Sequence, residues 1–163
     1  MTVAAAASGS LATFPSVAWF EALAERMRGN PEKYRKLGPV ELTLVLSIVY
    51  PDGRRERYAV EFEGLGVRSV AEVSDVSCVD GRHPVILEGE YAAFRDMIES
   101  IQTHGHADLT HTLNYLTLPD WPFTLQPVDE GAGQLDVDRF YRYNQSLQEF
   151  FDEAATVPTR FVT

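Results

Sequence analysis

Apolar residues recur at helical spacing in three parts of the chain. In the first, Val17, Phe20, Leu23 and Met27 are three or four positions apart, which predicts an amphipathic helix from Pro15-Ser16 to the stop signal at Gly29. Residues 31–38 predict a short basic helical turn. Residues 89–102 and 136–153 repeat the helical pattern, and the last of these stripes is mostly aromatic.

Strict alternation marks the strongest strand. Leu42, Leu44, Leu46 and Ile48 alternate with a second face that is itself half apolar, so residues 40–50 should form a strand covered on both sides. The Pro-Asp-Gly-Arg turn at 51–54 then reverses the chain into a second alternating run at 57–63. Residues 40–64 are therefore predicted to form an antiparallel hairpin.

The rest of the chain shows weaker signals. Residues 67–76 and 83–89 predict a third and a fourth strand, and residues 109–116 predict a short helix. Pro122 and Pro127 confine the extended piece at 121–128 to a sheet edge, and residues 129–134 predict a loop. No internal repeat is visible. The expected organisation is a flexible segment at 1–13 followed by one α+β domain at 14–163.

Composition narrows the function classes. The 163 residues suit one domain, and 45% of them are hydrophobic. A net charge of −10 argues against nucleic-acid binding and against docking on an anionic membrane. No apolar run is long enough to insert into a membrane, and the amino-terminal residues lack a signal-peptide pattern, so a cytoplasmic location is expected. Cys78 is the lone cysteine, which excludes an intramolecular disulfide.

The order of these elements resembles a known family. The run "FPSVAWFEALAERMRGNPEKYRKLG" followed by "VELTLVLSIVYPDGRRERYAVEFEGLGV" is similar to the sterol carrier protein 2 (SCP2-like) family, with Trp19, Leu23, Ala24 and Asn30 at the places of its helix motif. The segment "LEGEYAAFRDMIES" at 87–100 resembles that family's passage from strand through glycine to helix. The resemblance covers residues 14–101, and the sequence departs from the family pattern after Gln102.

The resemblance implies a five-stranded, mostly antiparallel sheet with helices packed on one face. It also implies an apolar tunnel between sheet and helices that takes up sterols, acyl chains or similar lipids, with no catalytic residues and no cofactor. Burial of apolar ligand surface would drive such binding at about 25 cal/mol per Å². The candidate ligand-binding residues are Trp19, Phe20, Leu23, Phe94, Ile98, Trp121, Phe140, Tyr143, Asn144 and Phe151. The alternative interpretation is that these are ordinary core residues.

Two other hypotheses remain open at this point. His104, His106 and Asp108 have a spacing found in zinc sites, which would suit a metal-dependent or acid–base enzyme at the mouth of the pocket. In the competing interpretation, His104 ends one helix, Asp108 caps the next and the segment is a polar loop. The other hypothesis is a homodimer in which the aromatic last helix covers a partner rather than its own sheet.

Overall fold

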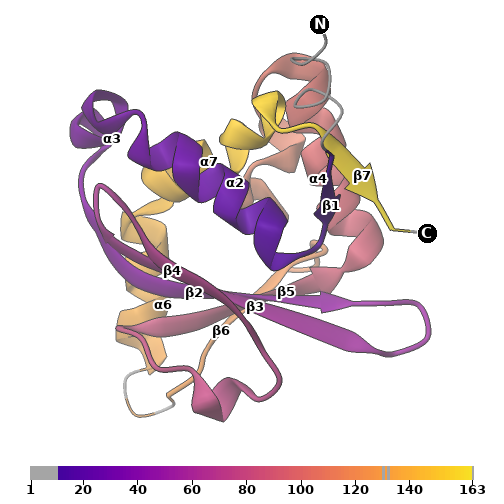
Figure 1. The fold of residues 1–163 in the computed structure, drawn as a ribbon. Coiled ribbons are helices and arrows are strands. Elements are labelled where there is room, and N and C mark those ends of the chain that lie inside the picture. Colours follow the sequence, from indigo (N-terminus) through magenta and orange to yellow (C-terminus); the bar gives the residue numbers. More distant parts are fainter. Residues whose placement is uncertain (1–10, 130, 132, 163) are drawn as a thin grey trace, which may run out of the picture.

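One five-stranded sheet forms the centre of the computed structural model, which describes residues 11–129, 131 and 133–162 (Figure 1). The strand order is β4-β3-β2-β5-β6. These strands are β2 (Val40–Val49), β3 (Arg55–Gly64), β4 (Gly66–Val73), β5 (Pro84–Glu90) and β6 (Thr124–Pro127). The β2–β5 pair is parallel and the other three pairs are antiparallel. The predicted α+β class with a mostly antiparallel five-stranded sheet is confirmed.

The predicted hairpin is present with an unbroken register. Val40 lies opposite Gly64 at one end of the pair and Val49 lies opposite Arg55 at the other. In the turn, the amide of Tyr50 donates to the carbonyl of Arg54 at 2.8 Å, and Gly53 has a φ of 88°, which glycine adopts without a steric penalty. The third strand ends at Val73 rather than at the predicted residue 76. It ends there because Asp75 caps a short 3₁₀ helix, η1 (Val76–Cys78), by accepting the Ser77 amide at 3.0 Å.

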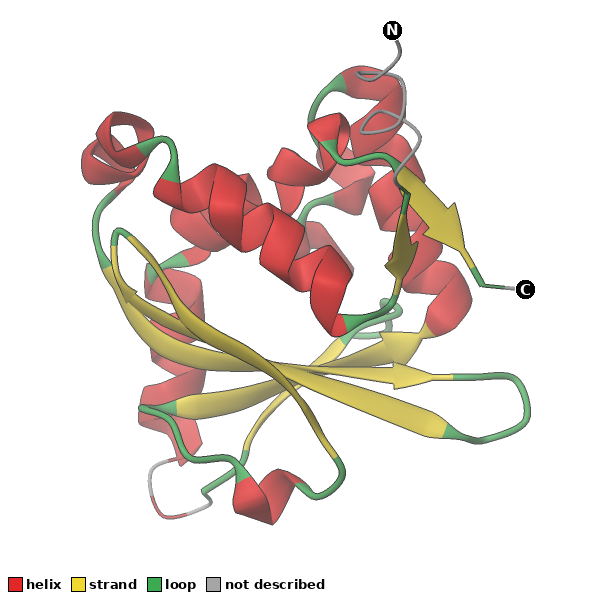
Figure 2. Cartoon of the chain, in the orientation of Figure 1, coloured by secondary structure: helices red, strands yellow, loops and turns green. Residues whose placement is uncertain are grey.

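Both faces of β2 are covered, as its half-apolar second face predicted. Leu42, Leu44, Leu46 and Ile48 are fully buried on the helix-covered face. The opposite face is buried at Thr43, Val45 and Ser47 as well. There the connection from β4 to β5 crosses the sheet, with η1 below the strands in Figure 2. Gly81 of this connection lies against Thr43, so closely that a Cβ at position 81 would clash with the threonine side chain.

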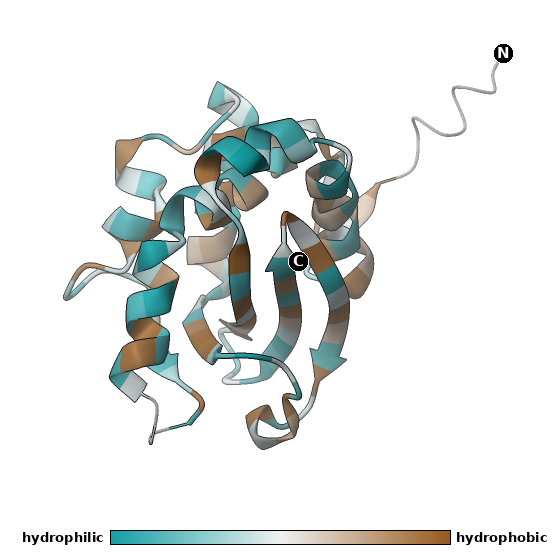
Figure 3. Cartoon of the chain, turned by 90° about the vertical axis from the view of Figure 1, so that its left-hand side faces the viewer, coloured by the Kyte–Doolittle hydropathy of each residue, from teal (hydrophilic) through white to brown (hydrophobic). Residues whose placement is uncertain are grey.

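Helices α2 (Val17–Arg28) and α4 (Tyr91–His104) lie on the other side of the sheet (Figure 1). Helix α2 begins at Ser16, whose hydroxyl accepts the Trp19 amide at 3.0 Å, and ends at Gly29. Helix α3 (Pro31–Leu37) follows. Helix α4 leaves β5 directly and ends at Gly105, whose φ is 83°. Figure 3 shows apolar bands alternating with polar ones along the strands, which is the pattern that directs one face toward the helices.

Two predicted helices of the carboxy-terminal half are each broken in two. Residues 109–111 form a 3₁₀ turn, η2 (Leu109–His111), and α5 (Leu113–Leu116) starts afresh because Thr112 is extended and caps it. The predicted helix at 136–153 is α6 (Gly133–Arg142) and α7 (Asn144–Asp152), followed by the 3₁₀ turn η4 (Glu153–Thr156). The break lies at Tyr143, where the side-chain amide of Asn144 donates to the Tyr141 carbonyl at 2.7 Å. As a result α6 lies against β5 and β6, whereas α7 packs against α2 and α4.

A second, very small sheet joins the two ends of the described chain. Strand β1 (Ala12–Phe14) pairs in parallel with β7 (Thr159–Phe161) beside α2 and α4 (Figure 1). Ala12 and Thr13 thus belong to a strand, although they fall in the segment predicted to be flexible; residues 1–10 of that segment lie outside the described residues. Within the described ranges, no helix combines the length and hydropathy needed to cross a bilayer.

Candidate ligand-binding region

The space between the sheet and the helices brings together seven of the ten predicted ligand-binding residues. They come from four helices and are at most 1% exposed. Trp19, Phe20 and Leu23 come from α2, Phe94 and Ile98 from α4, Phe140 from α6 and Phe151 from α7. All seven belong to one hydrophobic cluster with the apolar face of the sheet. In this structure they are packed against one another, so a ligand would have to part them.

Phe14 lies at the centre of an aromatic group inside this cluster and was not among the predicted residues. Its ring centroid is 4.8 Å from that of Trp19, 6.1 Å from Tyr91 and 6.3 Å from Phe94. Phe94 in turn lies 4.5 Å from Phe123. The one signal in the sequence is a large aromatic residue directly before a helix start. That signal gives Phe14 no role beyond the start of the domain, because a three-residue strand has no periodicity.

The remaining three predicted residues lie outside this aromatic group. Trp121 is 41% exposed in the turn before β6, where its ring packs edge-on against Tyr115 at 4.5 Å. Tyr143 is half-buried at the break between α6 and α7, where it packs against the edge of the hydrophobic cluster. Asn144 is half-buried too, and its side-chain oxygen accepts from Asn114 at 3.3 Å. The unbroken helical stripe assumed for residues 136–153 had placed Tyr143 and Asn144 with the others.

Two pockets lie at the edges of the apolar region. One, of about 310 Å³, is bordered by α3, α5 and α7 and has an amide-rich wall that includes Asn144 and Gln148. The other, of about 270 Å³, lies at the hairpin end of the sheet; we call it the Tyr91 pocket. It is lined by Tyr50, Pro51, Asp52, Arg54, Tyr91 and Val162.

The Tyr91 pocket has an aromatic wall that continues into the core. The rings of Tyr50 and Tyr91 stack with centroids 5.4 Å apart, and Tyr91 is the neighbour of Phe14. The Arg54 guanidinium lies 4.3 Å from the centre of the Tyr50 ring. Burial raises the pKa of both phenols, and the Tyr50 hydroxyl also donates to Glu56 at 2.6 Å. Both tyrosines are therefore neutral hydrogen-bond donors at physiological pH.

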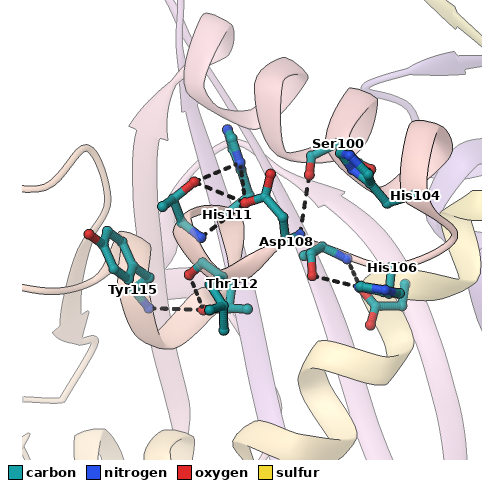
Figure 4. Close-up of polar contacts among 11 residues, drawn as sticks. Ser100, His104, His106, Asp108, His111, Thr112 and Tyr115 are labelled. Atoms are coloured by element: carbon teal, nitrogen blue, oxygen red, sulfur yellow. Dashed lines mark hydrogen bonds and ion pairs between the residues drawn. The ribbon is translucent and has the colours of Figure 1, made fainter.

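The histidine-rich segment does not bring its side chains together as a metal site (Figure 4). Nδ1 of His104 lies 2.9 Å from the carbonyl oxygen of Ser100, and Nδ1 of His106 lies 2.9 Å from that of Ala107. Asp108 instead caps η2, accepting the Thr110 amide at 2.9 Å, and lies 2.8 Å from Nδ1 of His111. Bonds from His111 and Thr110 hold the pKa of Asp108 well below its usual range. Among described residues, no group of three His, Cys, Asp or Glu side chains is arranged to hold a metal ion.

The segment that follows α4 is instead held to α7 by hydrogen bonds. The Ala107 amide donates to Asp152 at 3.1 Å, and Gln148 donates to the same carboxylate oxygen at 3.0 Å. The Leu113 amide donates to the side-chain oxygen of Gln148 at 2.7 Å. Burial raises the pKa of Asp152 despite these bonds. The interpretation of residues 104–111 as a capped polar loop agrees with the cap at Asp108, and the contacts with Asp152 and Gln148 add to it.

The aromatic face of the last helical region covers its own domain. Phe140, Leu147, Phe150 and Phe151 are buried in the core of the same chain. The Phe150 ring, for example, meets Phe62 of β3 edge-on at 4.9 Å. These side chains are thus packed inside their own chain, whereas the dimer hypothesis required them to face a partner.

Comparison with known proteins gives a likeness in fold and none in sequence. No model of a protein family matches the chain, and no curated protein matches it. A crystal structure of sterol carrier protein 2 is similar over 87% of this chain and 97% of its own, with a TM-score of 0.59 and 16% identity. A solution structure of a conserved hypothetical protein from Thermus thermophilus, described as possibly a sterol carrier protein, covers 88% of this chain and 90% of its own, with a TM-score of 0.54 and 16% identity. The fold implied by the sequence resemblance is confirmed.

Proposed function

We propose that this chain, whose fold is that of sterol carrier protein 2, binds and carries an apolar ligand between its sheet and its helices. The ligand would be a lipid, a sterol or an acyl chain. The observation that carries the proposal is the likeness of nearly the whole chain to a sterol carrier, combined with an aromatic-rich apolar region on the helix-covered face of the sheet. The likeness alone identifies a fold, and the apolar region is what a lipid would need from it.

The energetics of this region favour an oily ligand over a polar one. A ligand that enters removes its own apolar surface from water, which contributes about 25 cal/mol per Å². It must also separate side chains that are already packed, so part of that gain is offset by lost contacts. The net affinity therefore depends on how easily the helices part from the sheet. The ligand would leave at the place where the contacts between helices and sheet are weakest.

The buried polar side chains support carriage without chemistry. Most have a visible structural role. Ser47 donates to Glu88 at 2.8 Å, Ser146 donates to the Gly38 carbonyl at 3.0 Å, and Ser100 accepts the Asp108 amide at 3.3 Å. Asp136 lies beside Arg139, with the two side chains 3.3 Å apart. The Glu88 carboxylate that accepts from Ser47 also contacts Arg55 at 3.2 Å, so these three side chains join β2, β3 and β5.

The two tryptophans provide a direct test, because Trp19 lies in the proposed site and Trp121 lies outside it. Brominated lipids quench tryptophan fluorescence only at close contact, so 9,10-dibromostearic acid and 6,7-dibromocholesterol serve as probes. The Trp121→Phe variant reports on Trp19, and the matched Trp19→Phe variant reports on Trp121. We expect saturable quenching of Trp19 at one probe per chain and little quenching of Trp121. No saturable quenching of Trp19 by either probe would contradict the proposal.

A further inference from the structure

The closed core raises the question of where a ligand enters. The residues between sheet and helices are almost fully buried, so the entrance must be an element that moves. The sheet is held by ladders of up to ten paired residues, as between β2 and β3. By contrast, β1 and β7 share three paired residues. A two-stranded pair of that length is marginal by itself, and such elements open locally at low free energy.

Strand β7 lies directly over the aromatic group of the core. Its Phe161 ring is 6.2 Å from the ring of Phe14, and the Arg95 guanidinium lies 4.7 Å from the Phe161 ring centre. Phe161 is half-buried, whereas Phe14 beneath it is 1% exposed. Displacement of β7 would therefore uncover Phe14 and, beside it, Trp19 and Tyr91.

A few polar contacts hold the segment in place. The Trp19 indole nitrogen donates to the Thr159 hydroxyl at 3.0 Å, and the Tyr91 hydroxyl donates to the Val162 carbonyl at 2.8 Å. Gln102 donates to the Thr159 hydroxyl at 3.1 Å. These contacts are side-chain hydrogen bonds from α2 and α4, and once β7 has moved water can replace each of them at a net cost of about 1 kcal/mol.

The Tyr91 pocket lies at the edge of this segment. Val162, directly after β7, forms one wall of the pocket, and Tyr91 forms another. From there the stacked rings of Tyr50 and Tyr91 lead to Phe14. When β7 moves, the pocket becomes continuous with the apolar core. The Tyr91 hydroxyl would also lose its carbonyl partner and would be available to the polar end of an amphiphile.

The geometry points to β7 as the gate of the ligand site and to the Tyr91 pocket as its entrance. This inference rests on the proposed function. The ligand is an amphiphile whose apolar part passes Tyr91 into the core and whose polar end stays at the pocket. Strand β7 detaches from β1 first, and the helices then part from the sheet to admit the apolar part of the ligand.

A reversible cross-link between β1 and β7 tests the gate. Thr13 and Arg160 are paired in register, and Arg160 donates to the Thr13 hydroxyl at 3.2 Å, so their side chains lie on the same side. Adjacent strands are about 4.8 Å apart, within the range that a disulfide spans. The variant combines Thr13→Cys and Arg160→Cys with Cys78→Ser and Trp121→Phe, in the full chain. The rate of Trp19 quenching by 9,10-dibromostearic acid is then measured before and after reduction.

A matched control places the disulfide away from the gate. Ala59 and Ala71 are paired across β3 and β4, and both border a pocket on the opposite face of the sheet. The Ala59→Cys/Ala71→Cys variant is built on the same background. We expect oxidation to slow uptake by about tenfold or more in the β1–β7 variant, with recovery on reduction, and to leave the control unchanged, because only the first disulfide removes the open state.

The outcomes separate the gate from the proposed function. If both redox forms take up the probe at the same rate, the gate is wrong while ligand binding stands. If neither variant takes up the probe in either form, both the gate and the proposed function are wrong.

Hydrogen exchange tests the gate without a ligand. The amides of residues 159–161 should exchange at least about tenfold faster than those of β2. Equal protection of β7 and β2 would overturn the gate.

Discussion

Gly89 offers a sharp test of how closely the core is packed. It lies near the end of β5, where a Cβ would be 2.4 Å from Cδ1 and 2.7 Å from Cε1 of Phe123. Phe123 is 2% exposed and packs on Phe94, so its ring has little room to withdraw. Overpacking of this kind costs about 1–3 kcal/mol, and the loss of glycine's freedom in the unfolded chain offsets about 0.4–1 kcal/mol.

We therefore expect Gly89→Ala to lower the free energy of unfolding by about 1–2 kcal/mol. For a chain of this length that corresponds to a fall in Tm of about 2–8 °C. Chemical denaturation followed by circular dichroism measures the first quantity, and calorimetry measures the second. Gly29→Ala is the matched control. Gly29 has a φ of −78° and its Cβ would meet nothing closer than 3.4 Å, so that variant should be at least as stable as the parent.

A double-mutant cycle identifies the cause of the loss. Phe123→Ala alone should cost about 3–5 kcal/mol, because it leaves a large cavity. In the double variant the clash at position 89 is gone. Its loss of stability should therefore be smaller than the sum of the two single-variant losses by about 1 kcal/mol or more. Additive losses, or a Gly89→Ala variant as stable as the parent, would refute the close approach of the Phe123 ring to this strand.

Three further predictions concern polar groups. Thr43→Val should raise the free energy of unfolding by about 1 kcal/mol in denaturant titrations, because the buried hydroxyl has no partner among the described residues; a loss would show that it is hydrogen-bonded after all. Burial raises the pKa of Asp152, so the stability this carboxyl contributes is present at low pH and is lost as the pH rises through the raised pKa. In pH-dependent unfolding, Asp152→Asn should remove the fall in stability that begins above the ordinary pKa of aspartate, and should match the parent or better at pH 7. Asp152→Ala should instead cost about 1–3 kcal/mol, because it leaves the amides of Ala107 and Gln148 without their acceptor; the reverse order would contradict this. Neither zinc nor a chelator should change Tm by more than about 1 °C, and a saturable rise abolished by His106→Ala would overturn the structural interpretation of the loop.

The amino-terminal half was predictable because its signals are local. The alternation of Leu42, Leu44, Leu46 and Ile48 and the Pro51–Gly53 turn determine the hairpin without reference to the rest of the chain. Ser16 and Gly29 likewise delimit α2. The fold class followed from the order of these elements, which is why the resemblance could be recognised at 16% identity with the solved structures.

The carboxy-terminal half depended on contacts that no local pattern encodes. The break at Tyr143 leaves the apolar periodicity almost intact, but it turns α6 away from α7 and separates Asn144 from the aromatic group. The pairing of β1 with β7 joins residues 147 positions apart through strands too short to show alternation.

The candidate site was predictable as a region and less so as a set of residues. A helix stripe marks the buried face, which explains the convergence of Phe20, Phe94 and Phe151. The same stripe cannot distinguish a residue that lines a ligand from one that packs in the core. Trp121 carried no periodic signal, and the structure places it at the surface.

The central claim is that the chain carries an apolar molecule, and native mass spectrometry of the purified full chain tests it most directly. We expect a species heavier than the polypeptide by one amphiphile, whose identity solvent extraction then gives, or the uptake of one stearate or one cholesterol per chain on incubation. A spectrum with the bare polypeptide alone, before and after incubation with both lipids, would contradict it.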